Sequence, residues 1–277
     1  MALPDASRHD GLEGRGPELT HIAFQDDATG QILAAHFQLE PENTVGYLRA
    51  LRSMIATHGI PLSLYRDRHS IFQRNHAHCT LAEPLAGKQS RTPLGRALDQ
   101  LGIAPTPVSS PPAKGRIERA WRTCQDRLVQ RTSPRHATTL PAANAVLDRF
   151  CADYNRRFAR PPAQAACDFR SLPRRFDLAR CLALHYPRVV APDHTVTLGA
   201  SAIALPPLPG HRGSAGETVE LSHQLEGMLR AYRGDVLPLA LPLPLEEHAQ
   251  RRPAPRRTAQ KRKTRCPGSV TSPAARL

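Results

Sequence analysis

The sequence is poor in several features, and each scarcity argues against a class of protein. No stretch approaches the roughly 18 consecutive apolar residues of a membrane-spanning helix, and the N-terminal MALPDASRHDG lacks the apolar centre of a secretory leader. The six cysteines form no CxxC pair, which favours a reducing cytosol over a disulfide framework. There is also no Walker-type glycine-rich loop. We therefore expect no membrane partner and no nucleotide cofactor.

Acidic residues are scarce too, since 24 Asp and Glu stand against 38 Lys and Arg, for a net charge of +14. Phosphates dominate the electrostatics of nucleic acids, so nucleic acid is the leading partner for such a chain. Eight of the basic residues lie between positions 251 and 265, with no acid among them and no apolar period. This pattern predicts a disordered basic tail over residues 245–277.

Apolar periodicity predicts an α/β fold for the first part of the chain. We expect a hairpin at 18–38 around the turn DDATG, a helix at 43–58 capped by Asn43 or Thr44, and a buried strand in IPLSLY at 60–65. Further helices are expected at 92–103, 113–131 and 139–157, with a strand or loop in APTPVSS between the first two. Alternating strands and helices on this scale indicate an α/β domain of about 160 residues.

The second part changes character. Short strand-like runs follow one another with Gly and Pro between them: HYPRVVA, HTVTLG, AIALPP, ETVELSH, MLRAYRG and VLPLAL. Such spacing is typical of a small β-barrel. We predict a core domain over residues 1–165, a linker over 166–184, a small β-barrel over 185–244 and the tail over 245–277.

One basic helix carries a single early carboxylate. In SPPAKGRIERAWRTCQDRL, residues 110–128, Glu118 lies beside the apolar stripe that contains Trp121. An ion pair with Arg122 at i+4 is the plain explanation. The alternative is a metal ligand that works on a phosphate backbone, which the spacing alone does not select.

Asp67 follows the buried strand in IPLSLY, a position from which side chains reach the crevice of an open α/β sheet. It is either a turn residue or a second metal ligand. A two-metal site for phosphoryl transfer needs a further acid. The spacing leaves several candidates open: Asp5, Asp10, Glu13, Asp26 and Asp27.

Several stretches together resemble a known family. They are DASRHDGLEGRGPE (5–18), DDATG (26–30), LYRDRHSIF (64–72), LGRALDQLGI (94–103) and SPPAKGRIERAWRTCQDRL. They resemble the integrase-type transposases of bacterial insertion sequences, and most closely the ISNCY type. The likeness continues through ANAVLDRFCADYNRRFARPP and HYPRVVAPDHTVTLG, to about residue 245. It implies a ribonuclease-H-like integrase core, with a mixed five-stranded sheet, flanking helices and an Asp-Asp-Glu metal triad.

The resemblance implies that Asp5, Asp67 and Glu118 are the catalytic ligands of two Mg²⁺ (or Mn²⁺) ions. Asp5 matches the Asp that opens the family motif D-G-S-x-H-x-W-[FL]-E, where this chain reads D-A-S-R-H-D-G-L-E. His9 and Glu13 match the same motif. The acids at 26 and 27 then fall in a hairpin turn, where an Asp bonds its own backbone. Four basic residues are expected to bind DNA: Lys114, Arg116, Arg119 and Arg122.

The implied function is metal-dependent cleavage at transposon ends and 3′-OH strand transfer into target DNA. A homo-oligomer on DNA would carry it out, in the bacterial cytoplasm and at the nucleoid when bound. The chain departs from the family at Ala6 and Gly11, and only four residues precede Asp5 where members carry a DNA-reading region. We therefore expect a truncated copy whose first strand is a stub. The alternatives are a catalytically inactive DNA-binding remnant, and a nuclease or ribonuclease H with the same triad.

Two other signals favour ordinary structural roles. RHSIFQRNHAHCT holds His69, His76, His78 and Cys79, but it lacks the paired spacing of a zinc site, so we expect a solvated loop. Trp121 could stack on a base, yet its place in a helix stripe favours the core.

Overall fold

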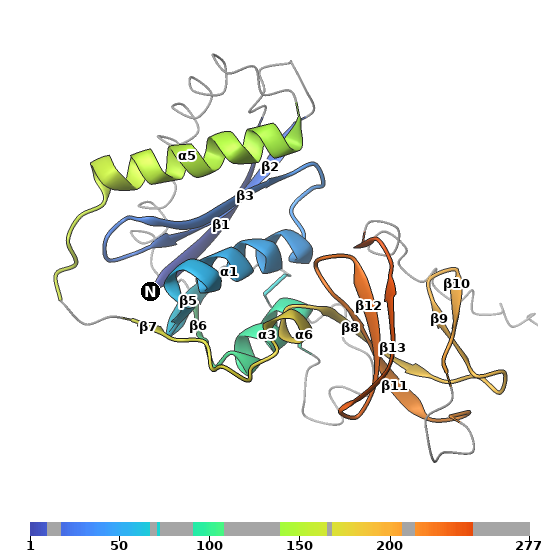
Figure 1. Ribbon diagram of the computed structural model, residues 1–277. Helices are drawn as coiled ribbons and strands as arrows, with labels where there is room; N and C mark the ends of the chain where they lie inside the picture. The colour runs from blue at the N-terminus through green and yellow to red at the C-terminus, as the bar shows by residue number, and fades with distance from the viewer. Residues whose placement is uncertain are drawn as a thin grey trace, which may run out of the picture.

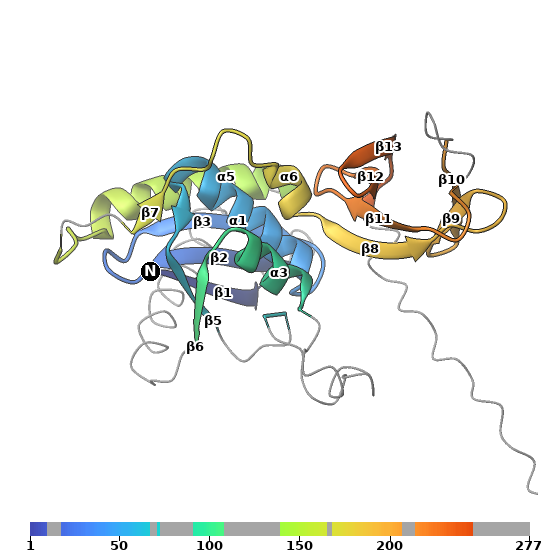
Figure 2. The same ribbon diagram turned by 90° about the horizontal axis from the view of Figure 1, so that it is seen from below.

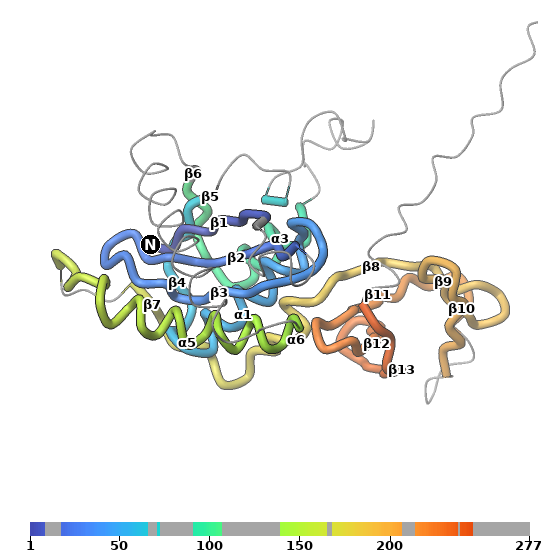
Figure 3. The backbone as a smooth tube through the Cα atoms, turned by 90° about the horizontal axis from the view of Figure 1, so that it is seen from above, coloured from blue at the N-terminus to red at the C-terminus, as the bar shows by residue number. Residues whose placement is uncertain are grey.

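The computed structural model describes residues 1–9, 18–66, 71–72, 91–107, 139–164, 168–206 and 214–245. A five-stranded sheet with helices on both faces organises the first part of the chain (Figure 1). The C-terminal strands form smaller sheets that lie to one side of it (Figure 3).

The strands of the first sheet run in the order β3-β2-β1-β5-β6. They are β1 (Ala2–His9), β2 (Leu19–Asp26), β3 (Ile32–Gln38), β5 (Ser63–Arg66) and β6 (Ala104–Pro107). β2 runs antiparallel to both β1 and β3, whereas β5 runs parallel to β1 and β6 parallel to β5. The predicted hairpin, the strand in APTPVSS and the mixed five-stranded sheet are confirmed.

β1 is the central strand of this sheet. Its ladder with β2 runs from Ala2 to His9, and it pairs with β5 through Ala2 and Leu64. Ala2 and Leu3 are buried, at 0% and 2% exposure. The expectation that the residues before Asp5 form only a stub is therefore wrong, because the ladder already begins at the second residue. β1 pairs with β5 at Ala2, two residues before Pro4. Pro4 has no N–H to donate to a neighbouring strand.

Each predicted helix within the described residues is present. α1 (Thr44–His58) begins after Asn43, whose side chain accepts a hydrogen bond from the Gly46 N–H, as predicted. α3 (Pro93–Gln100) and α5 (Leu140–Phe158) each begin after a threonine cap with proline in the first turn. The predicted helix at 113–131 lies outside the described residues.

The helices cover opposite faces of the sheet (Figure 2). Ala2 packs with the buried side chains of α1 and α3, whereas Leu3 packs with those of α5. Because neighbouring residues of a strand point to opposite faces, these two contacts assign one layer of helix to each face. The result is a three-layer arrangement with an apolar core on each side of β1.

The stretch IPLSLY is two strands rather than the single strand predicted. β4 (Ile60–Pro61) pairs with β7 (Phe169–Arg170), and β5 enters the main sheet after Leu62. Leu62 is 49% exposed. Periodicity missed this division because the partner of β4 is more than a hundred residues away along the chain.

The C-terminal part forms a four-stranded sheet in the order β13-β12-β11-β8 and a two-stranded sheet of β9 and β10. Its strands are β8 (Leu184–Val189), β9 (Thr195–Leu198), β10 (Ser201–Ala204), β11 (Thr218–His223), β12 (Met228–Arg233) and β13 (Val236–Pro242). One apolar cluster joins the two sheets. The six predicted strands are confirmed, and closure into a barrel stays a prediction.

The segment predicted as a linker packs onto the first part of the chain. It contains β7 and the short helix α6 (Leu178–Cys181), and Leu182 is fully buried. Leu225, at the β11–β12 turn, belongs to the same core as α1. The two parts of the chain therefore share apolar packing. The tail from residue 246 lies outside the described residues.

Candidate carboxylate site on the central sheet

Asp5 lies in the middle of β1, on the face of the sheet that α5 covers. Its partner on β2 is Ala23, which is buried and packs in the same core as Leu3. Asp5 itself is half-buried. The central strand therefore holds a carboxylate at the margin of an apolar core, partly shielded from water.

The neighbouring strand leads towards the second predicted acid. β5 ends at Arg66, so Asp67 is the next residue of the chain. Because β5 runs parallel to β1, the two strands leave the sheet in the same direction. Asp67 and Glu118 both lie outside the described residues, so the structure describes Asp5 alone of the three predicted ligands.

Other predicted site residues also fall outside the described ranges. His9 is described only as the last residue of β1, without its side chain, and Glu13 is not described. The remaining residues outside the described ranges are Lys114, Arg116, Arg119, Arg122, Trp121, His69, His76, His78 and Cys79. Their predicted roles stay predictions.

A metal site would need acids from more than one segment. Among the residues that the structure describes, no three His, Cys, Asp or Glu side chains are grouped as metal ligands. Asp5 offers a hard oxygen ligand, the kind that Mg²⁺ prefers. Three carboxylates would suit Mg²⁺ or Mn²⁺, so the chemistry of the predicted set fits those ions.

Asp26 has the structural role predicted for the hairpin turn. Its carboxylate accepts hydrogen bonds from the backbone N–H and the hydroxyl of Thr29, at 3.1 and 2.7 Å. Gly30 completes the turn with a φ of +69°, a conformation that glycine adopts without strain. These contacts hold the β2–β3 turn, as an Asp in such a turn commonly does.

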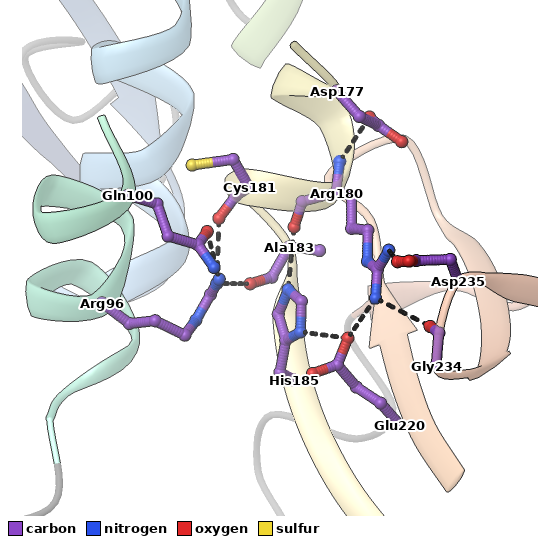
Figure 4. A network of polar contacts seen from close by, with 10 residues as sticks. All are labelled: Arg96, Gln100, Asp177, Arg180, Cys181, Ala183, His185, Glu220, Gly234 and Asp235. Atoms are coloured by element: carbon purple, nitrogen blue, oxygen red, sulfur yellow. Dashed lines mark hydrogen bonds and ion pairs between the residues drawn. The ribbon is translucent and has the colours of Figure 1, made fainter. Parts of the chain in front are cut away.

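A polar junction joins the C-terminal sheet to the first part of the chain (Figure 4). Arg96 of α3 donates hydrogen bonds to the carbonyl oxygens of Cys181 and Ala183, at 2.9 and 2.7 Å. Arg52 of α1 also pairs with Glu226 at the β11–β12 turn. Local sequence patterns do not reveal this junction, because its partners are more than eighty residues apart.

Arg180 of α6 anchors the other side of the junction. Its guanidinium contacts Glu220 at 3.2 Å and lies 4.0 Å from the ring centroid of Tyr232. His185 places one ring nitrogen 2.8 Å from the Arg180 carbonyl and the other 3.0 Å from Glu220. The ring therefore links the backbone of α6 to the Glu220 carboxylate on β11.

The surroundings shift the pKa values of Cys181 and Glu220 at the junction. Burial raises the pKa of the Cys181 thiol to about 11, although Arg96 opposes the shift. That thiol is a packed apolar group rather than a nucleophile. Burial also acts to raise the pKa of Glu220, but its contacts with His185 and Arg180 outweigh burial and hold that pKa below its ordinary value.

The likeness to known proteins is clear in sequence and faint in structure. No protein-family model matches the chain. Over 236 residues it is 34% identical to a protein of Sinorhizobium fredii named transposase y4bF, covering 84% of this chain and 50% of that protein. It is 31% identical over 234 residues to the transposase for insertion sequence IS1202 of Streptococcus pneumoniae, covering 84% of this chain and 47% of that protein. The chain resembles transposases.

The chain spans about half the length of the curated relatives it matches. Among solved structures it matches the simian T-cell lymphotropic virus intasome in complex with the PP2A regulatory subunit B56 gamma. The match covers 88% of this chain and 78% of that one, at 14% identity and a TM-score of 0.36. A structural similarity with so low a TM-score supports no conclusion about this chain. None of the described helices is long and apolar enough to cross a lipid bilayer.

Proposed function

We propose that the chain is the catalytic part of a DNA transposase of the Asp-Asp-Glu type, with a ribonuclease-H-like core. The observation that carries the proposal is the half-buried Asp5 on the central strand, next to a parallel strand that ends one residue before Asp67. The strand order and the helices on both faces agree with the integrase core that the family resemblance implies. Similarity to two proteins named transposases supports the same assignment.

The register of the sheet supports the pairing of the first two acids. Ala2 of β1 lies opposite Leu64 of β5. Asp5 is three residues beyond Ala2, and Asp67 is three residues beyond Leu64. If the register continued past the end of β5, the two carboxylates would stand side by side and, with the two-residue period of strands, on the same face.

In the proposed site, Asp5, Asp67 and Glu118 would hold two Mg²⁺ or Mn²⁺ ions. Such ions activate the attacking oxygen and stabilise the leaving oxygen of an in-line phosphoryl displacement. The protein forms no covalent bond to DNA. Water cleaves a phosphodiester at the element end and leaves a 3′-OH, which then displaces a 3′ oxygen in the target strand.

The basic residues near Glu118 have a separate task in this proposal. Lys114, Arg116, Arg119 and Arg122 would bind the phosphates on either side of the bond that is cut, and so keep it beside the acids. The C-terminal strands and the basic tail would add DNA contacts that weaken as salt rises. We expect the chain to act as a homo-oligomer on DNA, in the cytoplasm and at the nucleoid.

The test is cleavage and strand transfer with the full chain on DNA that carries the ends of its own element, in Mg²⁺ and in Mn²⁺. Asp5→Asn, Asp67→Asn and Glu118→Gln should each reduce both activities to background while DNA binding persists. Asp148→Asn, at an exposed acid on α5, is the matched control and should remain active.

The alternative of an inactive DNA-binding remnant gives a different result. In that case the unsubstituted chain binds DNA but neither cuts nor joins it with either metal. An activity that survives all three substitutions would rule out the proposed triad. Cleavage of an RNA–DNA hybrid without strand transfer would favour a ribonuclease H instead.

A further inference from the structure

β3 is an edge strand of the five-stranded sheet, because β2 alone of the described strands pairs with it. The backbone groups on the far side of an edge strand are open to pairing with another extended chain. In this protein, part of that far side is occupied by side chains of α5. The sequence ILAAHFQ of β3 is mostly apolar, so an open edge here would favour pairing with a strand of another chain.

Two asparagines of α5 bond the β3 backbone as a neighbouring strand would. Asn155 accepts a hydrogen bond from the Ile32 N–H and donates one to the Ile32 carbonyl, each at 2.8 Å. Asn144 does the same at Phe37, at 2.8 and 3.1 Å. A side-chain amide has one acceptor and a pair of N–H donors, which lets it replace the peptide group of a partner strand.

The spacing of the two asparagines matches that of the strand. They are eleven residues apart on a helix, which gives about 16 Å at 1.5 Å per residue and about three full turns, so both lie on one flank. Ile32 and Phe37 are five residues apart on a strand, which also spans about 16 Å. A third contact, from the Arg160 N–H to the Thr29 carbonyl at 2.9 Å, fixes the chain just beyond α5.

The other edge strands of the two larger described sheets are protected against strand addition in a different way. β6, β8 and β13 each contain proline, which cannot donate to an added strand. β3 has no proline. It is therefore the edge strand of these sheets that depends on another element for its protection.

We propose that Asn144 and Asn155 close the β3 edge against strand addition by a second copy of this chain. The second copy is the fitting partner because its own β3 offers the same apolar edge, and antiparallel pairing of two like edges is self-complementary. The net charge of +14 opposes this association, but salt screens it. The inference does not rest on the proposed function, and it implies that any working oligomer uses a different surface.

The test uses the full chain with Asn144→Ala and Asn155→Ala combined, at about 0.3 M salt to weaken charge repulsion. Alanine is the better helix former, so the substitutions do not weaken the helix itself. Arg149→Ala, at an exposed position on the other flank of α5, is the control. Residue-specific hydrogen exchange at the Ile32 and Phe37 amides is read by NMR, and the mass by light scattering, over a range of protein concentrations.

In the dilute double variant, the two amides should exchange roughly tenfold faster than in the unsubstituted chain, because each has lost its acceptor. As concentration rises, the mass should move towards twice 30.4 kDa and the amides should become protected again. The control should show neither change.

Two results would overturn the proposal. One is unchanged exchange in the double variant, and the other is faster exchange at every concentration with an unchanged mass. If the double variant loses its cooperative thermal transition, the single variant Asn155→Ala replaces it in the test. Hydrogen exchange and mass are then measured on that variant in the same way. A single variant that stays folded, with faster exchange and no concentration dependence, also refutes the inference.

Discussion

His36 on β3 should make the protein lose stability in mild acid. Its Nε2 is buried and makes no hydrogen bond within the described part of the chain. Burial, with a further contribution from the positive charge of Arg49, lowers the pKa of His36 from 6.5 to about 4. The folded state therefore binds this proton less readily than the unfolded state does.

The sign and size of the effect follow from that difference. With a folded pKa below the unfolded value, the contribution to stability is present above pH 6.5 and is lost as the pH falls towards 4. The shift corresponds to about 3.4 kcal/mol at most. The ring is only partly buried, so solvent screening reduces our expectation to about 1.5 kcal/mol.

The variant His36→Gln removes this titration. Between pH 7 and about pH 4.5, its free energy of unfolding should fall by about 1 to 1.5 kcal/mol less than that of the unsubstituted chain. Urea unfolding followed by circular dichroism at constant ionic strength measures the difference. Arg49→Gln should lessen the loss in the same direction, since it removes a positive charge near the ring. Parallel pH profiles for His36→Gln and the unsubstituted chain would refute the reasoning.

Three further predictions concern stability. Gly46→Ala should destabilise the chain by about 1 to 3 kcal/mol, because the added Cβ would clash with the side chains of Gln38 and Ile22; a gain in urea resistance would contradict this. Arg96→Ala should lower the free energy of unfolding by about 1 to 3 kcal/mol, because two carbonyls lose a partly buried donor; a midpoint equal to that of Arg149→Ala would contradict it. Glu220→Gln should destabilise the chain at pH 7, and the difference should shrink as the pH falls through the lowered pKa of Glu220; thermal melting from pH 7 to 3 measures it, and a constant difference would show that the charge is not involved.

The sequence by itself determined the local elements of this protein. Asn43 ahead of an apolar stripe placed the start of α1, and the turn DDATG placed the hairpin that Asp26 and Gly30 build. The strands after residue 184 were also found from their punctuation by Gly and Pro. These signals are readable because capping, turn chemistry and periodicity depend on residues within a few positions of one another.

The sequence also supplied the candidate acids, but through motif resemblance rather than spacing. Asp5 looked too close to the start of the chain to lie in a full strand, and β1 nevertheless forms from Ala2. The prediction of a short first strand was wrong because a central strand is stabilised by the strands on both sides of it. The residues before Asp5 do not show that those neighbouring strands are present.

Only the tertiary structure decided which distant segments meet. It divided IPLSLY between two sheets, packed the expected linker onto α3, and set Asn144 and Asn155 against the edge of β3. An asparagine is a poor helix former, yet nothing nearby in the sequence says what its amide binds. The physical reason is the same in each case: hydrogen bonds and apolar contacts between residues a hundred positions apart depend on how whole layers pack, and local periodicity carries no record of that.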